Sequence, residues 1–247
     1  MIFFPEKDFY ETPEDYDCVY ENVYLQAEDG VPLFGWFLTA AGPAAKGTLL
    51  FTHGNAGNIS SRLYKATGWI KRGFSVFLID YRGYGKSGGT VQNSKDILRD
   101  AQAGLKWLRE EKKLPLSEII LYGESLGTYP AIRLGAENRV LSVVLEAPFT
   151  SFLDLAGIHY PYVPKALMRD FKFENEKYVS DLQSPVFILH GKQDEICPYT
   201  MSETLFQKAP EPKELFCVRS GTHNDLAASA GEDFWRRPCE FLMRNKK

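Results

Sequence analysis

The stretch Gly123-Glu124-Ser125-Leu126-Gly127 directly follows the apolar run from Ile119 to Tyr122. It fits the pattern Gly-x-Ser-x-Gly, in which a serine occupies a sharp turn between a strand and a helix. Such a turn strains the backbone at the serine, and glycines on both sides leave room for the chain to close. Because glycine and serine are common, these five residues alone also fit an ordinary surface turn.

Short apolar runs recur on both sides of this junction, and helical patterns separate them. The runs cover residues 48–52, 74–79, 119–122, 143–145, 186–189 and 215–218. Near-continuous apolar runs are typical of strands that are buried on both faces of a parallel sheet. Helices are predicted over residues 61–72, closed by Gly73, and 93–112. Strands that alternate with helices in this way predict an α/β fold.

Two further strands are predicted before the first of these runs. Residues 23–27 and 31–38 flank the turn Glu28-Asp29-Gly30, which is typical of an antiparallel hairpin, here at the edge of the sheet. With them, the sequence predicts a mostly parallel central sheet of about eight strands with helices on both faces. A chain of 247 residues can fold as one domain, and we expect residues 1–247 to do so.

The alternation of strands and helices breaks between residues 150 and 184. This segment is rich in aromatic residues and prolines, among them Phe152, Tyr160, Tyr162 and Phe173. An insertion between two core strands predicts a small cap over the site. The alternative is a helical connector whose aromatic residues pack against the core.

Composition and charge exclude several classes of function. A formal net charge of −3 provides no electrostatic basis for binding nucleic acid, and none is expected as a partner. The four cysteines are widely spaced, as is typical of free thiols in a reducing compartment, and they suggest no metal site. No apolar run reaches the length of a membrane helix or of a signal peptide. We therefore expect a soluble, cytoplasmic protein without a metal or an organic cofactor.

A nucleophilic serine needs a general base, and the chain has four histidines. His53 and His190 each end an apolar strand before a glycine, which favours a structural role, and His159 falls in the predicted cap. His223 lies in a loop after the last strand, at the edge where open α/β folds place their sites. The position favours His223 as the base.

The base in turn needs a carboxylate that orients it and stabilises the imidazolium. Asp194 and Glu146 both follow predicted strands, and the loop position of Asp194 favours it over Glu146. Asp225 is so close to His223 in sequence that we expect it to cap the following helix instead. The resulting order of serine, acid and histidine is Ser125, Asp194, His223.

An oxyanion needs two N–H donors, one of which is expected from Leu126, directly after the serine. The second is expected from the glycine-containing loop His53-Gly-Asn-Ala-Gly-Asn58, at Asn55 or its neighbour Ala56. The loop matches neither GxGxxG nor GxxxxGK[ST], which argues against a phosphate site.

Five motifs in order now resemble the α/β-hydrolase superfamily, and most closely its short-capped abhydrolase-domain (ABHD) branch of serine hydrolases. They are 53–58, Asp80-Tyr-Arg-Gly-Tyr-Gly-Lys-Ser87, 123–127, His190-Gly-Lys-Gln-Asp194 and Gly221-Thr-His-Asn-Asp225. The resemblance implies that 80–87 is a structural loop beside the oxyanion loop, in which Arg82 ties loops together. Relatives in this branch often carry an amino-terminal membrane anchor, which this sequence lacks before Phe3.

The sequence therefore predicts a serine hydrolase that cleaves carboxylic esters of small to medium acyl groups through an acyl-enzyme. Tyr160, Tyr162 and Ile196 are candidates for lining the substrate pocket; alternatively, they only pack the cap. The same triad would serve an acyl-protein thioesterase, since the ABHD branch includes depalmitoylases, or a small-peptide hydrolase. A binding protein that keeps the scaffold without catalysis is the alternative from another class.

Overall fold

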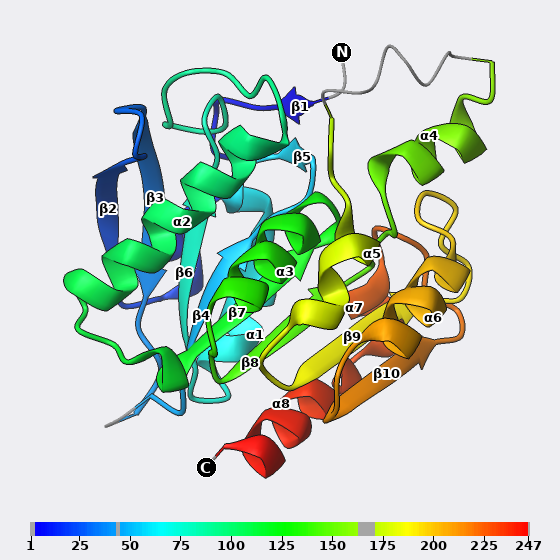
Figure 1. The fold of residues 1–247 in the computed structure, drawn as a ribbon. Helices are drawn as coiled ribbons and strands as arrows, with labels where there is room; N and C mark the ends of the chain where they lie inside the picture. The colour runs from blue at the N-terminus through cyan, green and yellow to red at the C-terminus, as the bar shows by residue number, and fades with distance from the viewer. Residues whose placement is uncertain (1–2, 43–44, 163–170, 247) are drawn as a thin grey trace.

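The computed structural model describes residues 3–42, 45–162 and 171–246 (Figure 1). Within these ranges a main sheet of eight strands forms the centre of the molecule. The strands are β2 (Tyr20–Gln26), β3 (Pro32–Leu38), β4 (Thr48–Thr52), β6 (Ser75–Asp80), β7 (Ile119–Glu124), β8 (Ser142–Glu146), β9 (Val186–Gly191) and β10 (Lys213–Val218). Their order across the sheet is β10-β9-β8-β7-β4-β6-β3-β2. The expected strand number and all eight strand positions are confirmed.

The hairpin and the parallel core are both as predicted. β2 pairs antiparallel with β3, and β3 pairs antiparallel with β6. The remaining neighbours from β6 to β10 are parallel. The side chains of β4, β6, β8 and β9 are buried along their full length, because helices cover both faces.

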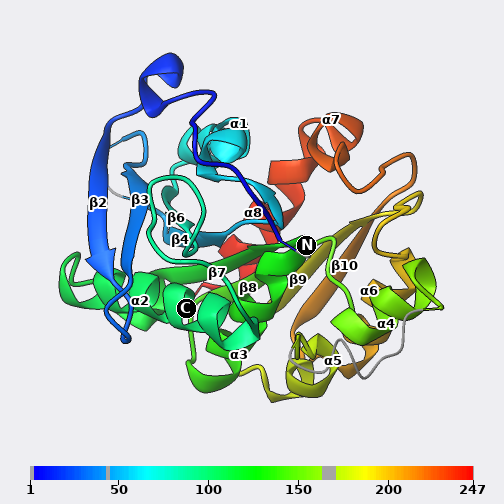
Figure 2. The ribbon, with the colours of Figure 1, turned by 90° about the horizontal axis from the view of Figure 1, so that it is seen from above.

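Helices form a layer on each face of the sheet, as Figure 2 shows. One layer contains α2 (Ser94–Glu110), α3 (Thr128–Glu137), α5 (Asn175–Tyr178) and α6 (Tyr199–Lys208), and the other contains α1 (Leu63–Ile70), α7 (Leu226–Ala230) and α8 (Asp233–Asn245). Each layer closes its own apolar cluster against the sheet. Helix α2 begins at its N-cap Asn93, and α1 is followed by Gly73 at φ +86°, so both predicted helices are confirmed with shorter ends.

The segment 150–184 connects β8 to β9. It contains α4 (Phe152–His159), α5 and the 3-10 turn η6 (Val179–Asp181), and its residues 163–170 lie outside the described residues. Asn175 anchors it by donating to the Phe149 carbonyl (2.9 Å) and to Thr128 Oγ1 (3.0 Å). Phe173 is fully buried against Tyr129, so packing explains this aromatic residue. The role of the segment as a cap stays a prediction.

A second, two-stranded sheet lies beside the main one. β1 (Phe4–Pro5) pairs parallel with β5 (Ala56–Gly57), and Glu6 N–H donates to the Gly57 carbonyl at 3.1 Å. Two-residue strands have no detectable periodicity, which is why the sequence did not predict them. The pairing places the amino-terminal segment against the loop after β4.

The loop of residues 80–87 is tied down as the resemblance implies. Arg82 donates to Asp100 Oδ1 on α2 at 2.7 Å and to Asp29 Oδ2 in the hairpin turn at 2.8 Å. Asp100 is fully buried, and a buried carboxylate is tolerated when it is paired in this way. Arg82 therefore joins the 80–87 loop to the hairpin turn and to α2.

Candidate active site

The nucleophile turn has the geometry that its sequence predicts. β7 ends at Glu124, and Ser125 follows with φ +50°, a left-handed conformation that is strained for a residue with a side chain. Glycine is required on both sides by close approach. A Cβ on Gly123 would lie 2.5 Å from the Gly127 carbonyl oxygen, and one on Gly127 would lie 1.9 Å from the Thr52 carbonyl oxygen. The turn closes tightly because neither residue has a side chain.

Three side chains from three strand ends form one hydrogen-bonded chain. Ser125 follows β7, Asp194 follows β9, and His223 lies between β10 and α7. His223 Nε2 is 3.0 Å from Ser125 Oγ, and His223 Nδ1 is 2.7 Å from Asp194 Oδ2. Since a carboxylate only accepts, Nδ1–H donates to Asp194, which leaves Nε2 free to accept the serine proton. The sequence-predicted serine, acid and histidine are thus brought together.

Asp194 is held as an anion by donors on both oxygens. Oδ1 accepts from the backbone N–H groups of Ile196 (2.9 Å) and Cys197 (2.7 Å), while Oδ2 accepts from His223 and from His190 Nε2 (3.0 Å). Burial alone would raise the pKa of Asp194, but the hydrogen bonds from His190 and His223 outweigh it and hold this pKa well below its usual range. The acid is therefore charged throughout the physiological pH range.

His190 and Cys197 are two site residues that sequence reasoning missed. The fully buried His190 was assigned a structural role, yet its ring contacts the acid of the triad. The Cys197 backbone N–H donates to Asp194 Oδ1 at 2.7 Å, and burial raises the pKa of its thiol, whereas His223 and Ser125 act in the opposite direction. The only sequence signal was the position of both residues within four of Asp194.

The pH dependence of activity should follow His223. Burial alone would lower the pKa of its imidazole, but hydrogen bonding to Asp194 raises it above the ordinary value of about 6.5. Because the base must be neutral, kcat/KM should rise with pH through a value above about 6.5. Asp194→Asn should move this inflection downward and lower the plateau by about 10⁴-fold. The measurement is a pH–rate profile with an ester that does not titrate; a wild-type inflection at or below about 6.5 would contradict it.

The alternative acid and one of the alternative bases make other contacts in the structure. Glu146, the alternative acid, accepts from Lys65 Nζ (2.7 Å) and from Tyr122 Oη (2.5 Å) beneath the turn. His53 is fully buried, with Nδ1 2.7 Å from the Gly54 carbonyl, which confirms its structural role.

The expected cap at Asp225 is wrong. Asp225 stands directly before α7, but its carboxylate accepts from no backbone N–H of the first turn and instead accepts from Thr222 N–H at 2.7 Å. A carboxylate can close its own loop by accepting from a backbone N–H nearby in sequence, and here that bond competes with the helix cap. Asp225 thus closes the loop that presents His223.

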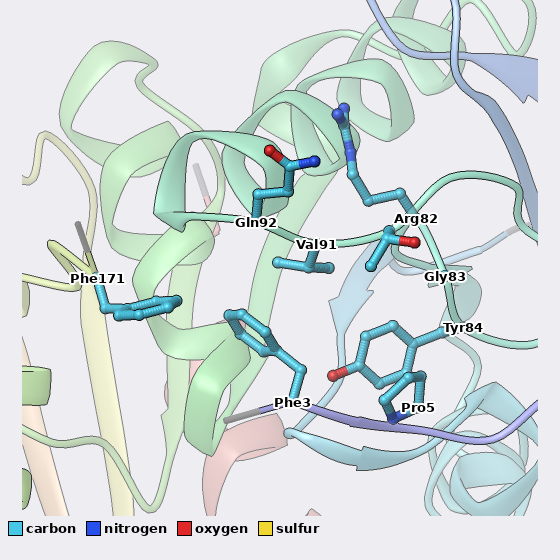
Figure 3. A pocket seen from close by; sticks show the side chains of 9 residues that line it. Phe3, Pro5, Arg82, Gly83, Tyr84, Val91, Gln92 and Phe171 are labelled. Atoms are coloured by element: carbon cyan, nitrogen blue, oxygen red, sulfur yellow. The ribbon is translucent and has the colours of Figure 1, made fainter. Parts of the chain in front are cut away.

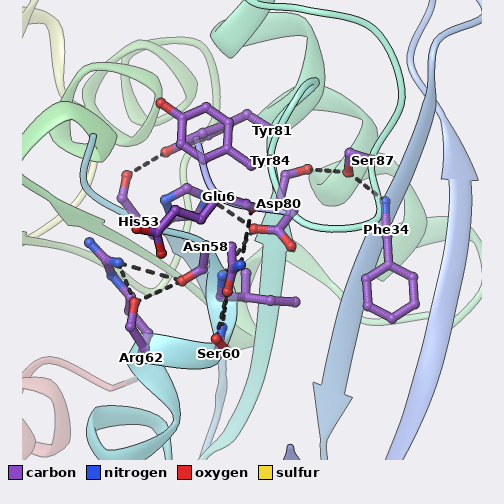
Figure 4. Close-up of polar contacts among 12 residues, drawn as sticks. Glu6, Phe34, His53, Asn58, Ser60, Arg62, Asp80, Tyr81, Tyr84 and Ser87 are labelled. Carbon is purple, nitrogen blue, oxygen red and sulfur yellow. Dashed lines mark hydrogen bonds and ion pairs between the residues drawn. The ribbon is translucent and has the colours of Figure 1, made fainter. Parts of the chain in front are cut away.

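The loop of residues 53–58, called the oxyanion loop below, is held by the neighbouring tyrosines. Tyr81 Oη donates to the His53 carbonyl (2.9 Å), and Tyr84 Oη donates to the Asn55 carbonyl (2.8 Å), while Figure 4 shows both rings over the loop. The 80–87 loop is therefore adjacent to the oxyanion loop, as the resemblance implies. The N–H groups of Asn55 and Leu126 stay predictions as oxyanion donors.

The three residues predicted to contact substrate, two in the segment 150–184 and one in the loop after β9, are at least partly exposed. Tyr160 and Tyr162 are 63% and 97% exposed, and Ile196 is 39% exposed. Ile196 lies closest to the site, because its N–H donates to Asp194 and its carbonyl is 2.7 Å from His159 Nε2 on α4. His159 thus connects the segment 150–184 to the loop after β9 that contains Asp194. A substrate role for these residues stays a prediction.

An apolar cavity of about 450 Å³ lies between the amino-terminal segment, the loop after β6 and the segment before α5. Phe3, Tyr84, Val91 and Phe171 line it together with Pro5 (Figure 3). Tyr84 belongs both to this cavity and, through its hydroxyl, to the oxyanion loop. The sequence did not indicate the cavity, because its walls come from the amino terminus, the loop after β6 and the segment before α5.

A buried network of charges lies directly beneath Ser125, and sequence reasoning missed it as well. Glu124, the first of the two unspecified positions in Gly-x-Ser-x-Gly, accepts from Arg62 Nη2 (2.9 Å) and from Lys65 Nζ (3.0 Å). Burial would raise the pKa of Glu124, but Arg62 and Lys65 outweigh it and hold this pKa well below its usual range. Lys65 also contacts Glu146, so the network joins the ends of β7 and β8 to α1.

The fold and this site define an α/β hydrolase. A family model described as serine aminopeptidase, S33, matches residues 43–172. Uncharacterized protein YfhR of Escherichia coli strain K12 is 31% identical, over 98% of this chain and 86% of that protein. α/β-Hydrolase domain-containing protein 17B of Xenopus laevis is 34% identical, over 74% and 62% respectively. The chain belongs to the α/β-hydrolase superfamily, in its ABHD branch.

The fold also agrees with a solved structure. Pyrococcus furiosus esterase Pf2001 matches with a TM-score of 0.79 at 24% identity, and the match covers 98% of both chains. Among the described residues, no helix has both the length and the apolar character needed to cross a membrane.

Proposed function

We propose that this protein is a serine hydrolase that cleaves carboxylic esters through an acyl-enzyme intermediate. The observation that carries the proposal is the hydrogen-bonded chain from Ser125 through His223 to Asp194, with the serine in a left-handed turn. A complete chain of this kind is what nucleophilic catalysis by serine requires. It argues against a binding protein that has lost catalysis, since such a protein would be free to lose one of the three.

The proposed reaction has two halves, formation of the acyl-enzyme and its hydrolysis, and His223 acts as base and then as acid in each. His223 Nε2 takes the proton of Ser125 as Oγ attacks the ester carbonyl, and the N–H groups of Leu126 and Asn55 stabilise the oxyanion. The imidazolium then protonates the leaving alcohol, and the acyl-enzyme forms. Water, deprotonated by the same imidazole, attacks the acyl-enzyme and releases the acid and the free serine. Asp194 stays ionised throughout and orients the ring.

The acyl group is proposed to be apolar and of small to medium size. An apolar cavity of about 450 Å³ supports this choice through Tyr84, whose side chain lines the cavity and whose hydroxyl bonds the oxyanion loop; Ser125 and His223 do not line it. Hydrolysis of short peptides is a second candidate, favoured by the description of the matching family model as serine aminopeptidase. A thioester substrate uses the same chemistry, so a common panel of substrates can separate the three.

Fluorophosphonate labelling tests the proposal. We expect one covalent adduct, located at Ser125 by peptide mass spectrometry, because the neutral imidazole activates this hydroxyl alone. Turnover of acyl esters, acyl thioesters and aminoacyl amides of graded length should then be highest for the esters. Folded protein that forms no adduct at Ser125, under conditions that label a reference serine hydrolase, would refute the enzyme assignment. Adduct formation with amides as the best substrates would favour the peptidase.

A further inference from the structure

Arg62 connects the two segments that are proposed to supply the oxyanion donors. It lies just before α1, and its side chain is only 11% exposed. Nη1 donates to the Ala56 carbonyl at 2.7 Å, and Nη2 donates to Glu124 Oε1 at 2.9 Å. One planar guanidinium thus contacts the oxyanion loop on one edge and the residue before Ser125 on the other (Figure 4 shows its approach to the loop).

The glycines of the oxyanion loop make room for this ion pair. A Cβ on Gly54 would lie 2.9 Å from Glu124 Oε1 and 3.1 Å from Arg62 Nη2. One on Gly57 would lie 3.2 Å from Arg62 Nη1. At all three distances, the Arg62 or Glu124 side chain would have to shift to make room for the Cβ. The loop therefore folds around the Arg62 and Glu124 side chains.

The carboxylate partner of Arg62 is itself fixed. Glu124 also accepts from Lys65, which is paired with Glu146 at the end of the neighbouring strand. Backbone pairing between β4 and β7 ends at Thr52 and Gly123, just before the two segments that carry the donors. Beyond that point, the spacing depends on the close approach of Gly127 to the Thr52 and His53 carbonyls and on side-chain bonds that join the two segments. Among the described residues, Arg62 is bonded directly to both segments.

We propose that Arg62 is a positioning residue that sets the distance between the oxyanion loop and the nucleophile turn. It acts through the Ala56 carbonyl and the Glu124 carboxylate, and it does not touch the substrate. The inference rests on the proposed function, in which N–H groups of the two segments bind one oxyanion. Misplacing such a donor by about 1 Å costs about 10²-fold in rate. Arg62 should therefore affect kcat far more than KM.

The test compares Arg62→Gln and Arg62→Lys with Arg133→Gln. Arg133 lies on α3 and pairs with the more exposed Glu137, so its variant controls for the loss of an arginine near the site. We expect Arg62→Gln to lower kcat by about 10²-fold with KM within about threefold. Arg62→Lys, which keeps the charge but cannot span both partners, should recover part of this loss. Arg133→Gln should stay within about twofold of wild type.

Stability and loop exposure are measured on the same variants. Rates are taken per folded molecule, from thermal unfolding followed by circular dichroism. Hydrogen exchange of the peptide covering 53–58 should be faster in Arg62→Gln and unchanged in Arg133→Gln. A folded Arg62→Gln with wild-type kcat and wild-type exchange would overturn the proposal. Unfolding of both Arg62 variants below the assay temperature would also overturn it, in favour of a purely structural role.

The experiments distinguish failure of the proposed enzyme function from failure of the proposal about Arg62. If wild-type protein neither hydrolyses esters nor forms the fluorophosphonate adduct, the enzyme assignment fails. Hydrogen exchange of the 53–58 peptide then still decides whether Arg62 holds the loop, since it needs no activity.

Discussion

Ser125→Ala is expected to lower kcat for ester hydrolysis by at least about 10⁴-fold. The hydroxyl is the group that His223 Nε2 meets at 3.0 Å, and alanine leaves the imidazole without a nucleophile to activate. Binding and oxyanion stabilisation by the remaining groups would account for whatever rate above the uncatalysed reaction survives. The measurement is steady-state hydrolysis of the best ester of the panel, together with the fluorophosphonate adduct, which should disappear.

The fold should survive this substitution. The Ser125 side chain is partly exposed, and its loss removes a single hydrogen bond, so the free energy of unfolding should change by about 1 kcal/mol or less. Ser180→Ala, at an exposed serine in the 150–184 segment, is the matched control and should keep full activity. A folded Ser125→Ala protein that retains a tenth or more of the wild-type rate would show that Ser125 is not the nucleophile.

Gly127→Ala should destabilise the protein by about 3 kcal/mol or more. The added Cβ would lie 1.9 Å from the Thr52 carbonyl oxygen and 2.5 Å from its carbon, so backbone must move in β4 or in the turn. Thr52 Oγ1 also donates to the Gly127 carbonyl at 2.8 Å, and this bond would be disturbed as well. Urea unfolding followed by circular dichroism measures the loss.

Gly157→Ala is the control for the same chemical change. Gly157 lies in α4, where a Cβ would meet nothing within 4 Å. Alanine should stabilise this helix by up to about 1 kcal/mol, because it restricts the unfolded chain and favours the helix. Opposite signs at the two glycines are the expected result. Equally small changes in the free energy of unfolding for the two variants would contradict this prediction, because they would show that the turn accommodates a methyl group by a small local shift.

Much of the fold could be predicted because its signals are local. The apolar runs that became β4, β6, β8 and β9 read as buried strands since helices cover both faces of the sheet. The Asp29-Gly30 turn predicted the hairpin through turn chemistry alone. The pairing of β1 with β5 had no such signal, because it joins two-residue segments some 50 residues apart in sequence.

The proximity of Ser125, Asp194 and His223 could also be predicted, since parallel strands end at one edge of the sheet and each of these residues follows a strand. The roles of the neighbouring residues Asp225 and His190 could not be predicted. Asp225 closes its own loop instead of capping α7, and His190 supports Asp194 from within the strand. Both outcomes depend on which hydrogen-bonding group lies nearest in the folded chain, and that distance cannot be read from the separation of residues in sequence.

The α/β architecture and the order Ser125, Asp194, His223 follow from the residues alone, because periodicity and strand-end position act over short stretches of chain. The bonds by which Arg62 and Glu124 join the oxyanion loop to the nucleophile turn, and the cavity that Phe3 and Phe171 line, could be found only in the folded chain. Those contacts form between segments distant in sequence, and buried charges and aromatic rings choose their partners by distance and desolvation once the sheet has brought them together.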